Sequence, residues 1–422
     1  MASTPSIPGT PSLADLGRRA QRASQELAGA STGAKDAALA AAADLIVRGG
    51  DDLMAANAED VARAERSETS PTVVDRLRLD PARVEAMAEG LRQVAALADP
   101  VGEVVEGWVR PNGLRVSRVR VPLGVVGIIY ENRPNVTSDA AGLCLKSGNA
   151  AFLRGSSAAV RSNQVIAGLL QEGVAKAGLP ADAVVLVEDG SRESAREFMQ
   201  LRGMIDCLVP RGGRSLVASV LEHATVPYII DGDGNCHVYV DSAADLETAL
   251  AIVVNAKTQR PSVCNAAESL LVHRDVAESF LPGVRSALEG VELLGDERVT
   301  RILPGIQQAT DDDFATEFLD LKLSVAVVDS LDGAIDHIRR YGSGHSEAIV
   351  TDDLRAATRF TREVDAAAVL VNASTRFVDG GELGLGAEIG ISTQKLHARG
   401  PMGLRELTTI KYVIQGEGQV RT

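Results

Sequence analysis

From Leu123 onward, short apolar runs alternate with helical patterns, and this alternation restricts the fold of the chain more than any other feature. The expected strands are residues 125–129, 150–153, 183–187 and 205–209. The helical patterns between and after them end at Lys146, at Ala177 and at His223. Strands that alternate with helices usually run in parallel, with helices on both faces of the sheet. The sequence therefore predicts the α/β fold class, with a doubly wound sheet.

A second series of the same kind follows. Its expected strands are residues 270–273, 324–328, 347–350 and 368–371, and its expected helices are residues 277–288, 331–340 and 354–364. The chain has 422 residues, of which 45% are hydrophobic, so it is long enough for two or three domains with sizeable cores. We therefore expect two doubly wound α/β domains.

The segments outside these two series have other patterns. Residues 13–97 are rich in alanine and charge with helical spacing, which predicts a helical layer. Residues 108–122 contain the turn pair Asn112-Gly113, after which apolar residues alternate with arginines. This pattern fits either an ordinary surface hairpin or a protruding arm with an edge strand that awaits a partner. Residues 407–414 alternate in the same way, and we expect them to pair with the hairpin.

Composition excludes several classes of function. A net charge of -14 and an aromatic content of 3% argue against nucleic acid as a partner. The four cysteines form no C-x-x-C pair, which indicates neither a metal centre nor a disulfide framework and fits a reducing cytoplasm. The first dozen residues lack the basic and apolar segments of a signal peptide, and no run of about 18 apolar residues predicts a membrane span. We expect a cytoplasmic globular protein that does not enter membranes.

Cys264 is the candidate for the chemistry, because it lies on a connection between a helical pattern and a short apolar strand. Pro261 and Ser262 are typical of a new helical turn, which would place the thiol at a helix N-terminus. Lys257 and Arg260 add positive charge nearby in the sequence. Both features lower the pKa of a thiol and favour the nucleophilic thiolate. The alternative is that Cys264 packs as a small apolar residue.

Two glycine-rich segments are candidate ligand loops. Gly212 and Gly213 follow an expected strand and open a helix, and Arg214 with Arg211 adds charge, which is typical of a phosphate site. No G-x-G-x-x-G or Walker motif is present, and the glycine pair could instead allow a helix to pack closely on its strand. Residues 379–390 are glycine-rich and apolar, and we expect a loop close to a ligand.

Four segments together resemble the gamma-glutamyl phosphate reductases, also called glutamate-5-semialdehyde dehydrogenases, of the aldehyde dehydrogenase superfamily. They are residues 125–136 (VVGIIYENRPNV), 145–156 (LKSGNAAFLRGS), 263–273 (VCNAAESLLVH) and 371–391. The resemblance implies NADPH-dependent reduction of L-glutamate 5-phosphate to L-glutamate 5-semialdehyde, with release of phosphate, in proline biosynthesis. Glutamate 5-kinase is then a possible partner. A homo-oligomer is expected for a separate reason, because the arm strands would otherwise expose unpaired edges.

The same resemblance assigns roles to individual residues. It implies that Cys264 is the nucleophile, that Asn135 and the Cys264 backbone N–H are the oxyanion donors, and that Glu317 holds the nicotinamide ribose. Arg376 and Gly380 are candidates for substrate binding. Considered without the resemblance, Asn135 would be a loop cap and Glu317 a solvated acid. An aldehyde or acyl-thioester dehydrogenase with another substrate is the alternative enzyme, and an inactive scaffold is the alternative from another class.

The cofactor preference is predicted from Arg154, Ser156 and Ser157, which follow a short expected strand. NAD-preferring members of the superfamily have an acid where this chain has Ser157, and that acid would repel a 2′-phosphate. A cation and two hydroxyls favour NADPH; the alternative is that Arg154 is only a surface charge. The resulting domain prediction is residues 1–106 and 122–240 for the dinucleotide, 241–398 for the thiol, and 107–121 with 399–422 for an oligomerisation arm.

Overall fold

The computed structural model describes residues 11–67 and 69–421. The first dozen residues, which the sequence predicts to be a terminal tail without a signal peptide, lie mostly outside the described residues. The chain divides into two compact units. The first contains Met1–Ile230, Leu385–Ile389 and Met402–Thr422, and the second contains Asp231–Gly384 and Gly390–Pro401. The change of unit after Ile230 comes ten residues before the predicted boundary at residue 240, because the intervening segment contributes a strand to the second unit.

The first unit is built on a four-stranded sheet with the order β5-β4-β3-β6. Its strands are β3 (Val125–Tyr130), β4 (Ala150–Gly155), β5 (Val184–Leu186) and β6 (Cys207–Arg211). All neighbouring strands are parallel, as the alternating pattern predicts. β3 and β4 are buried along their whole length, since helices cover both faces of the sheet.

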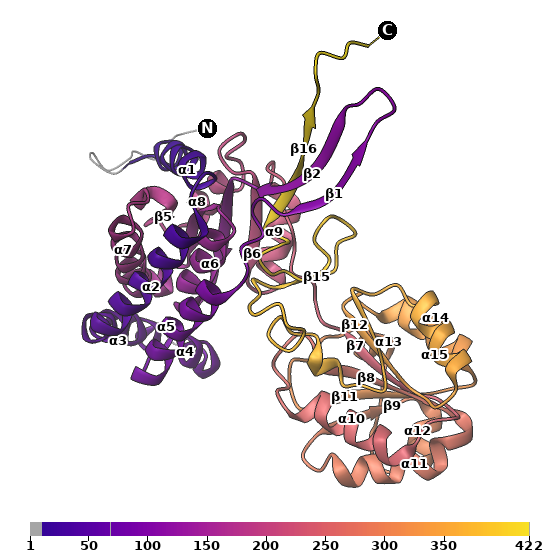
Figure 1. Cartoon of the computed structure of the whole chain (residues 1–422). Coiled ribbons are helices and arrows are strands. Elements are labelled where there is room, and N and C mark those ends of the chain that lie inside the picture. The colour runs from indigo at the N-terminus through magenta and orange to yellow at the C-terminus, as the bar shows by residue number, and fades with distance from the viewer. Residues whose placement is uncertain (1–10, 68, 422) are drawn as a thin grey trace. The chain divides into compact units, whose positions relative to one another are not determined.

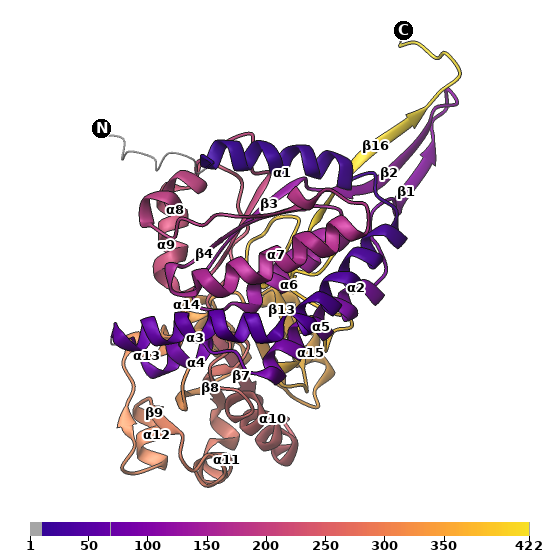
Figure 2. The same ribbon diagram turned by 90° about the vertical axis from the view of Figure 1, so that its left-hand side faces the viewer.

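One face of this sheet packs against α1 (Leu13–Leu27), α8 (Arg192–Phe198) and α9 (Arg214–His223) through a shared apolar core. The helices of the other side are α2 (Thr32–Arg48), α3 (Gly50–Arg66), α4 (Pro71–Leu77), α5 (Pro81–Ala96), α6 (Asn135–Lys146) and α7 (Val160–Lys176). α6 contacts β4, α7 contacts β5, and α2 packs on α5, α6 and α7 (Figure 2). The helices predicted for residues 13–97 are therefore present as α1 to α5, but α1 lies on the opposite face of the sheet from the other four.

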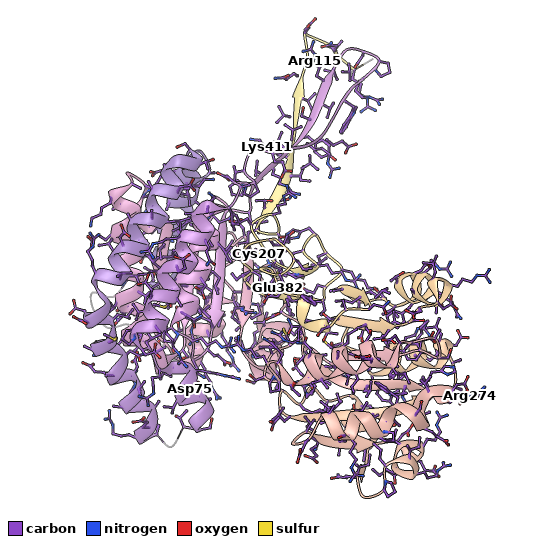
Figure 3. All side chains as sticks on the ribbon, turned by 60° about the horizontal axis from the view of Figure 1, so that its bottom comes forward. Asp75, Arg115, Cys207, Arg274, Glu382 and Lys411 are labelled. Carbon is purple, nitrogen blue, oxygen red and sulfur yellow. The ribbon has the colours of Figure 1, made fainter. Side chains whose placement is uncertain are left out.

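The predicted hairpin and the C-terminal strand form one three-stranded antiparallel arm. It consists of β1 (Val104–Val109), β2 (Arg115–Pro122) and β16 (Thr408–Gln415), with β2 in the centre. Gly113 has φ +88°, as the predicted turn requires. Figure 1 shows the arm extending from the sheet of its own unit, and Figure 3 shows Arg115 toward its tip. The side chains of β1 are exposed, whereas most of those of β2 are half-buried. Its ordinary-hairpin alternative is excluded, because β16 pairs along the whole of β2.

The second unit contains a seven-stranded parallel sheet with the order β10-β9-β11-β8-β7-β12-β13. Its strands are β7 (Cys236–Val240), β8 (Ala267–His273), β9 (Glu292–Gly295), β10 (Gln307–Gln308), β11 (Lys322–Val328), β12 (Ser346–Val350) and β13 (Ala368–Val371). Its α-helices are α10 (Leu246–Thr258), α11 (Arg274–Ala287), α12 (Glu297–Ile302), α13 (Asp311–Phe314), α14 (Leu331–Tyr341) and α15 (Leu354–Glu363). Two apolar cores, one on each face, hold these helices on the sheet.

The sequence pattern does not predict the inner strand β7, which contains His237 and Tyr239 among apolar residues. The glycine-rich residues 379–390 form no helix or strand, and a two-stranded ladder of β14 (Ile391–Ser392) and β15 (Gly400–Pro401) follows them. Among the helices in residues 11–67 and 69–421, none is both long and apolar enough to cross a membrane. Within the same ranges, no group of three or more His, Cys, Asp or Glu side chains is arranged to hold a metal ion.

Candidate active site

Cys264 lies in the turn between α10 and β8, and it is the most accessible of the four cysteines. It is half-buried, whereas Cys144, Cys207 and Cys236 are buried. Burial raises the pKa of Cys207 to about 12 and raises the pKa of Cys144 and of Cys236 as well. Those three thiols therefore stay protonated at neutral pH. Among the four cysteines, only Cys264 is accessible, and it lies just before the amino end of β8.

The surroundings of Cys264 differ from the predicted ones in two respects. Residues 259–266 form turns and bends without a helix, so the thiol is not at a helix N-terminus. Lys257 is fully buried, and its ammonium donates to the carboxylate of buried Glu268 at 2.7 Å. Burial lowers the pKa of Lys257 and raises the pKa of Glu268 to about 7, and their attraction opposes both shifts. The Lys257 charge is thus largely compensated by Glu268.

Arg376 provides a cation in this region instead. Its Nε donates to Oε1 of Gln259 at 2.8 Å, which fixes the half-buried guanidinium against the segment that leads to Cys264. Burial lowers the pKa of Arg376, and the charges of Asp379, Arg260 and Cys264 also act on it. The predicted substrate residue Arg376 is thus close enough to the predicted nucleophile Cys264 for their charges to interact. Gly380 follows Asp379 in the irregular glycine-rich segment.

Glu317 and Cys264 both lie against Gly234, which precedes β7. The Gly234 backbone N–H donates to Oε1 of Glu317 at 2.7 Å. A Cβ atom at Gly234 would lie 1.6 Å from the Cys264 carbonyl oxygen. That oxygen also accepts from the Cys236 thiol at 3.2 Å. The predicted nucleophile and the predicted cofactor ligand are therefore held by one short segment, at the amino end of the strands.

In the first unit, Asn135 is the first residue of α6. Its Nδ2 donates to Oδ2 of Asp139 at 2.8 Å, and its backbone carbonyl accepts from the Ser138 hydroxyl at 2.8 Å. An amide nitrogen has two hydrogens, so this bond orients the Asn135 side chain and leaves one hydrogen for a ligand. Burial raises the pKa of Asp139 to about 6, against the opposing effect of its bond from Asn135.

Asn132 is a residue of the same loop that the sequence analysis does not single out. Its backbone is left-handed, with φ +48°. Its Oδ1 accepts from the Ser156 hydroxyl at 3.2 Å, and its N–H donates to that hydroxyl at 3.4 Å. A left-handed non-glycine residue often marks a functional loop. The signal in the sequence is weak, because it consists only of two asparagines spaced three apart.

The residues predicted to bind the adenosine end of the cofactor lie at the end of β4. Ser157 is exposed and begins a 3-10 turn (Ser157–Ala159), whereas Arg154 is 7% exposed and donates to the Ser191 carbonyl at 2.6 Å. A half-buried cation beside Ser157 is Arg63 of α3, which donates to the backbone carbonyls of Ser157 at 3.0 Å and Ala158 at 3.3 Å.

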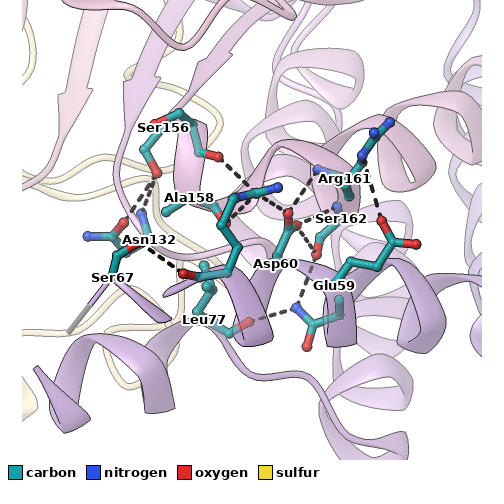
Figure 4. A network of polar contacts seen from close by, with 12 residues as sticks. Glu59, Asp60, Ser67, Leu77, Asn132, Ser156, Ala158, Arg161 and Ser162 are labelled. Atoms are coloured by element: carbon teal, nitrogen blue, oxygen red, sulfur yellow. Dashed lines mark hydrogen bonds and ion pairs between the residues drawn. The ribbon is translucent and has the colours of Figure 1, made fainter. Parts of the chain in front are cut away.

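Buried Asp60 anchors this corner (Figure 4). It forms an ion pair with Arg63 and accepts from the backbone N–H and the hydroxyl of Ser162, each at 2.8 Å. A carboxylate next to the first turn of α7 satisfies backbone donors that the helix leaves unpaired. The network therefore fixes the turn that contains Ser157, through residues from α3 that are about a hundred positions away in the sequence.

The glycine pair before α9 is engaged within the protein. Gly213 donates its backbone N–H to Oε2 of Glu131 at 3.1 Å. A Cβ atom at Gly212 would lie 2.5 Å from the same oxygen and 2.7 Å from Cδ2 of Leu216. Close approach thus explains the glycine at position 212. Arg214 begins the helix. A phosphate at this helix would compete with the Glu131 carboxylate for the Gly213 N–H.

Comparisons with known proteins identify the family of the chain. The model of the aldehyde dehydrogenase family matches residues 15–316. The chain is 54% identical over 406 residues to gamma-glutamyl phosphate reductase of Caldanaerobacter subterraneus subsp. tengcongensis, covering 96% of this chain and 98% of that one. It is 56% identical over 408 residues to the Thermobifida fusca reductase, with the same coverage. The crystal structure of the Thermotoga maritima reductase superimposes with TM-score 0.95 at 46% identity, covering 96% of this chain and 99% of that chain.

Proposed function

Since the chain belongs to the aldehyde dehydrogenase family, and within it to the gamma-glutamyl phosphate reductases, we propose that it reduces L-glutamate 5-phosphate to L-glutamate 5-semialdehyde with release of phosphate. This is a step of proline biosynthesis. The observation that carries the proposal is the half-buried Cys264 within the electrostatic range of Arg376. A nucleophilic thiolate needs both access and a nearby cation, and an acyl phosphate brings further negative charge that a cation stabilises.

In the proposed mechanism, the Cys264 thiolate attacks the acyl carbon. A carbon–sulfur bond forms, the bond from carbon to the phosphate oxygen breaks, and a thioester remains. The Asn135 amide and the Cys264 N–H are the proposed donors to the tetrahedral oxyanion. A reduced nicotinamide cofactor, when bound, supplies the hydride that reduces the thioester to the aldehyde level. Cleavage of the carbon–sulfur bond then returns the thiolate, and Arg376 with the Gly380 segment is proposed to orient the substrate.

The described residues fit a nicotinamide cofactor in each unit taken by itself. Glu317 presents a half-buried carboxylate next to Cys264, which suits a ribose hydroxyl. In the first unit, exposed Ser157 lies against Arg63 and lacks a carboxylate side chain of its own. Arg154 supports the turn from within, through Ser191, and adds positive charge without reaching the surface. We propose that this corner prefers NADPH, with Ser157 as a hydroxyl donor and Ser156 as a second donor once its hydroxyl leaves Oδ1 of Asn132.

A substrate assay tests the proposed function. The purified chain should consume NADPH only when glutamate 5-phosphate is present, and in reverse it should reduce NADP⁺ only when glutamate 5-semialdehyde and phosphate are both present. Dependence of the reverse reaction on phosphate identifies an acyl phosphate as the product. Turnover with coenzyme A in place of phosphate would favour the alternative acyl-thioester dehydrogenase, and no turnover with any acyl donor would favour a scaffold.

Ser157→Glu should shift the cofactor preference toward NADH. A carboxylate at this exposed position would repel a 2′-phosphate by an amount on the order of 1–3 kcal/mol. The ratio of kcat/KM for NADPH to that for NADH should therefore fall roughly 5- to 150-fold. Ser157→Gln is the matched control, because it has the same size without the charge. A parent enzyme that prefers NADH, or equal ratios in the Glu and Gln variants, would show that the 2′-position is recognised elsewhere.

The arm is proposed to hold the protein in a homo-oligomer. Its exposed apolar side chains include Val104, Val109, Trp108, Tyr412 and Ile414, and its edge strands β1 and β16 have no partner on one side within the described chain. An open strand edge can pair with another chain, and large exposed apolar patches mark sites of protein–protein interaction. Association with glutamate 5-kinase, the enzyme that would supply the substrate, stays a prediction.

Deleting residues from Leu407 onward should yield monomer or aggregate, because it removes β16 and exposes the edge of β2. Light scattering coupled to size-exclusion chromatography measures the outcome. The control is a truncation after Gln415, which keeps β16 intact. The proposal would be contradicted if the longer deletion left the mass of the assembly unchanged.

A further inference from the structure

Gly234 is the closest neighbour of the Cys264 main chain among the glycines that the structure describes. A Cβ atom at this position would lie 1.6 Å from the Cys264 carbonyl oxygen, 2.3 Å from its carbonyl carbon and 2.5 Å from its Cα. All three atoms belong to the backbone, so no side-chain rotation can make room. Only a shift of the Cys264 peptide or of the Gly234 segment could accommodate a methyl group.

The backbone N–H of Gly234 binds Glu317. The Gly234 N–H donates to Oε1 of Glu317 at 2.7 Å, a short distance that is typical of a charge-assisted hydrogen bond. The chain beyond Glu317 is held as well, since the Leu319 N–H donates to Oε1 of Glu268 at 3.1 Å. Glu268 is itself paired with Lys257 in the core. One hydrogen bond therefore holds the Glu317 carboxylate, and another holds the main chain two residues beyond it.

The Gly234 segment is fixed by its next residue, Asn235. The buried Asn235 amide donates to the carbonyl of Phe314 at 2.8 Å and to the carbonyl of Tyr341 at 2.7 Å, and its backbone N–H donates to the Ser343 hydroxyl at 3.0 Å. Three bonds to two other segments make this a rigid attachment. The segment can therefore transmit a constraint from Glu317 to the Cys264 peptide.

We propose that Gly234 is a positioning residue. Its Cα, which has no side chain, allows the Cys264 peptide to pack against it, and its N–H fixes the Glu317 carboxylate by a hydrogen bond. The proposal rests on the proposed function, in which Cys264 is the nucleophile and Glu317 holds the cofactor. Reduction would require the thioester on Cys264 to lie next to the cofactor that Glu317 would hold. A single rigid segment that contacts both holding groups fixes this alignment, and only glycine fits there.

Gly234→Ala tests the proposal most directly, and Gly283→Ala is its matched control. Gly283 belongs to the same unit and has no atom within 4 Å of the position that its Cβ would take. We expect Gly234→Ala to lower kcat by roughly 100-fold, because displacements of about 1 Å have effects of this size. It should also change the iodoacetamide alkylation rate of Cys264 without cofactor and weaken NADP⁺ binding in calorimetry. Parent values for alkylation and binding in a folded Gly234→Ala protein would overturn the proposal.

A second pair of variants keeps the test decisive if Gly234→Ala does not fold. Glu317→Gln keeps an oxygen that accepts from the Gly234 N–H, whereas Glu317→Leu removes it, and both remove the charge. We expect the leucine variant to change the rate of Cys264 alkylation in the absence of cofactor, and the glutamine variant to stay close to the parent. Equal alkylation rates in these two variants would mean that Glu317 and Cys264 are not coupled through Gly234.

Failure of the proposed function gives a different result. If the parent enzyme does not turn over glutamate 5-phosphate, the substrate assignment is wrong, but the alkylation comparisons still measure whether Gly234 couples the two residues. If the parent reduces glutamate 5-phosphate but neither comparison shows a difference in the alkylation rate of Cys264, the proposed function is retained and the positioning role of Gly234 is rejected.

Discussion

Cys264→Ala should reduce turnover of glutamate 5-phosphate to background, a loss on the order of 10,000-fold or more. No other thiol can take over, because burial raises the pKa of Cys144, Cys207 and Cys236 and keeps each of them protonated. Binding of NADP⁺ and the melting temperature should remain close to those of the parent, since Cys264 is only half-buried. Steady-state kinetics, calorimetry and thermal unfolding measure the three quantities.

The remaining cysteines provide the controls for this prediction. Serine at position 144, 207 or 236 should retain turnover, and at position 236 its hydroxyl can still donate to the Cys264 carbonyl as the thiol does. One equivalent of iodoacetamide should inactivate the parent and label Cys264 alone, as identified by mass spectrometry. Labelling of another cysteine with loss of activity, or more than trace turnover in Cys264→Ala, would remove Cys264 from the mechanism.

The parallel sheets were predictable because their strands are buried on both faces and are therefore continuous apolar runs. β3 is continuously apolar up to its last residue, Tyr130, and β4 is continuously apolar up to Arg154, near its end. β7 fails the same test, because His237 and Tyr239 interrupt it. Each of these residues has a polar partner, Glu347 at Nδ1 of His237 and Asp241 at the hydroxyl of Tyr239. Local pattern cannot reveal the first pair, since Glu347 is on β12, 110 positions away from His237.

The environment of the thiol was predicted incorrectly for a related reason. Pro261 and Ser262 favour a helical start locally, but the chain must reach β8 within a few residues, and turns replace the helix. The proximity of Lys257 in sequence indicated a cation at the thiol, but Glu268 on β8 attracts it into the core. The cation within range, Arg376, follows more than a hundred residues later. Charge at a site depends on tertiary pairing, which sequence distance does not measure.

The predicted cofactor site around Ser157 also shows that closeness in sequence does not determine closeness of function. Arg154 and Ser157 are close in sequence and were grouped as one phosphate site, yet they separate into a buried support and an exposed turn. Arg63 completes the corner from α3, where its spacing among other charged residues gives no signal. The glycine pair at positions 212 and 213 is likewise explained by close packing against Glu131 and Leu216, the alternative that the sequence left open.

Asn135→Ala should lower kcat by roughly 100-fold or more, the usual effect of removing an oxyanion donor. KM should change less, because the donor acts on charge that develops in the transition state. Asp139 orients the Asn135 amide through a 2.8 Å bond, so Asp139→Ala should lower kcat in the same direction by a smaller factor.

Asn132→Ala is the comparison that makes this prediction sharp. Asn132 lies in the same loop, but its side chain is engaged with Ser156. If Asn135 is the donor, Asn132→Ala should retain most of the parent kcat, with any loss appearing in cofactor affinity through Ser156. If Asn135→Ala keeps the parent rate while Asn132→Ala loses it, the left-handed Asn132 is the donor and the assignment of Asn135 is wrong. Parent rates in both variants would leave the backbone N–H of Cys264 as the donor that stabilises the oxyanion.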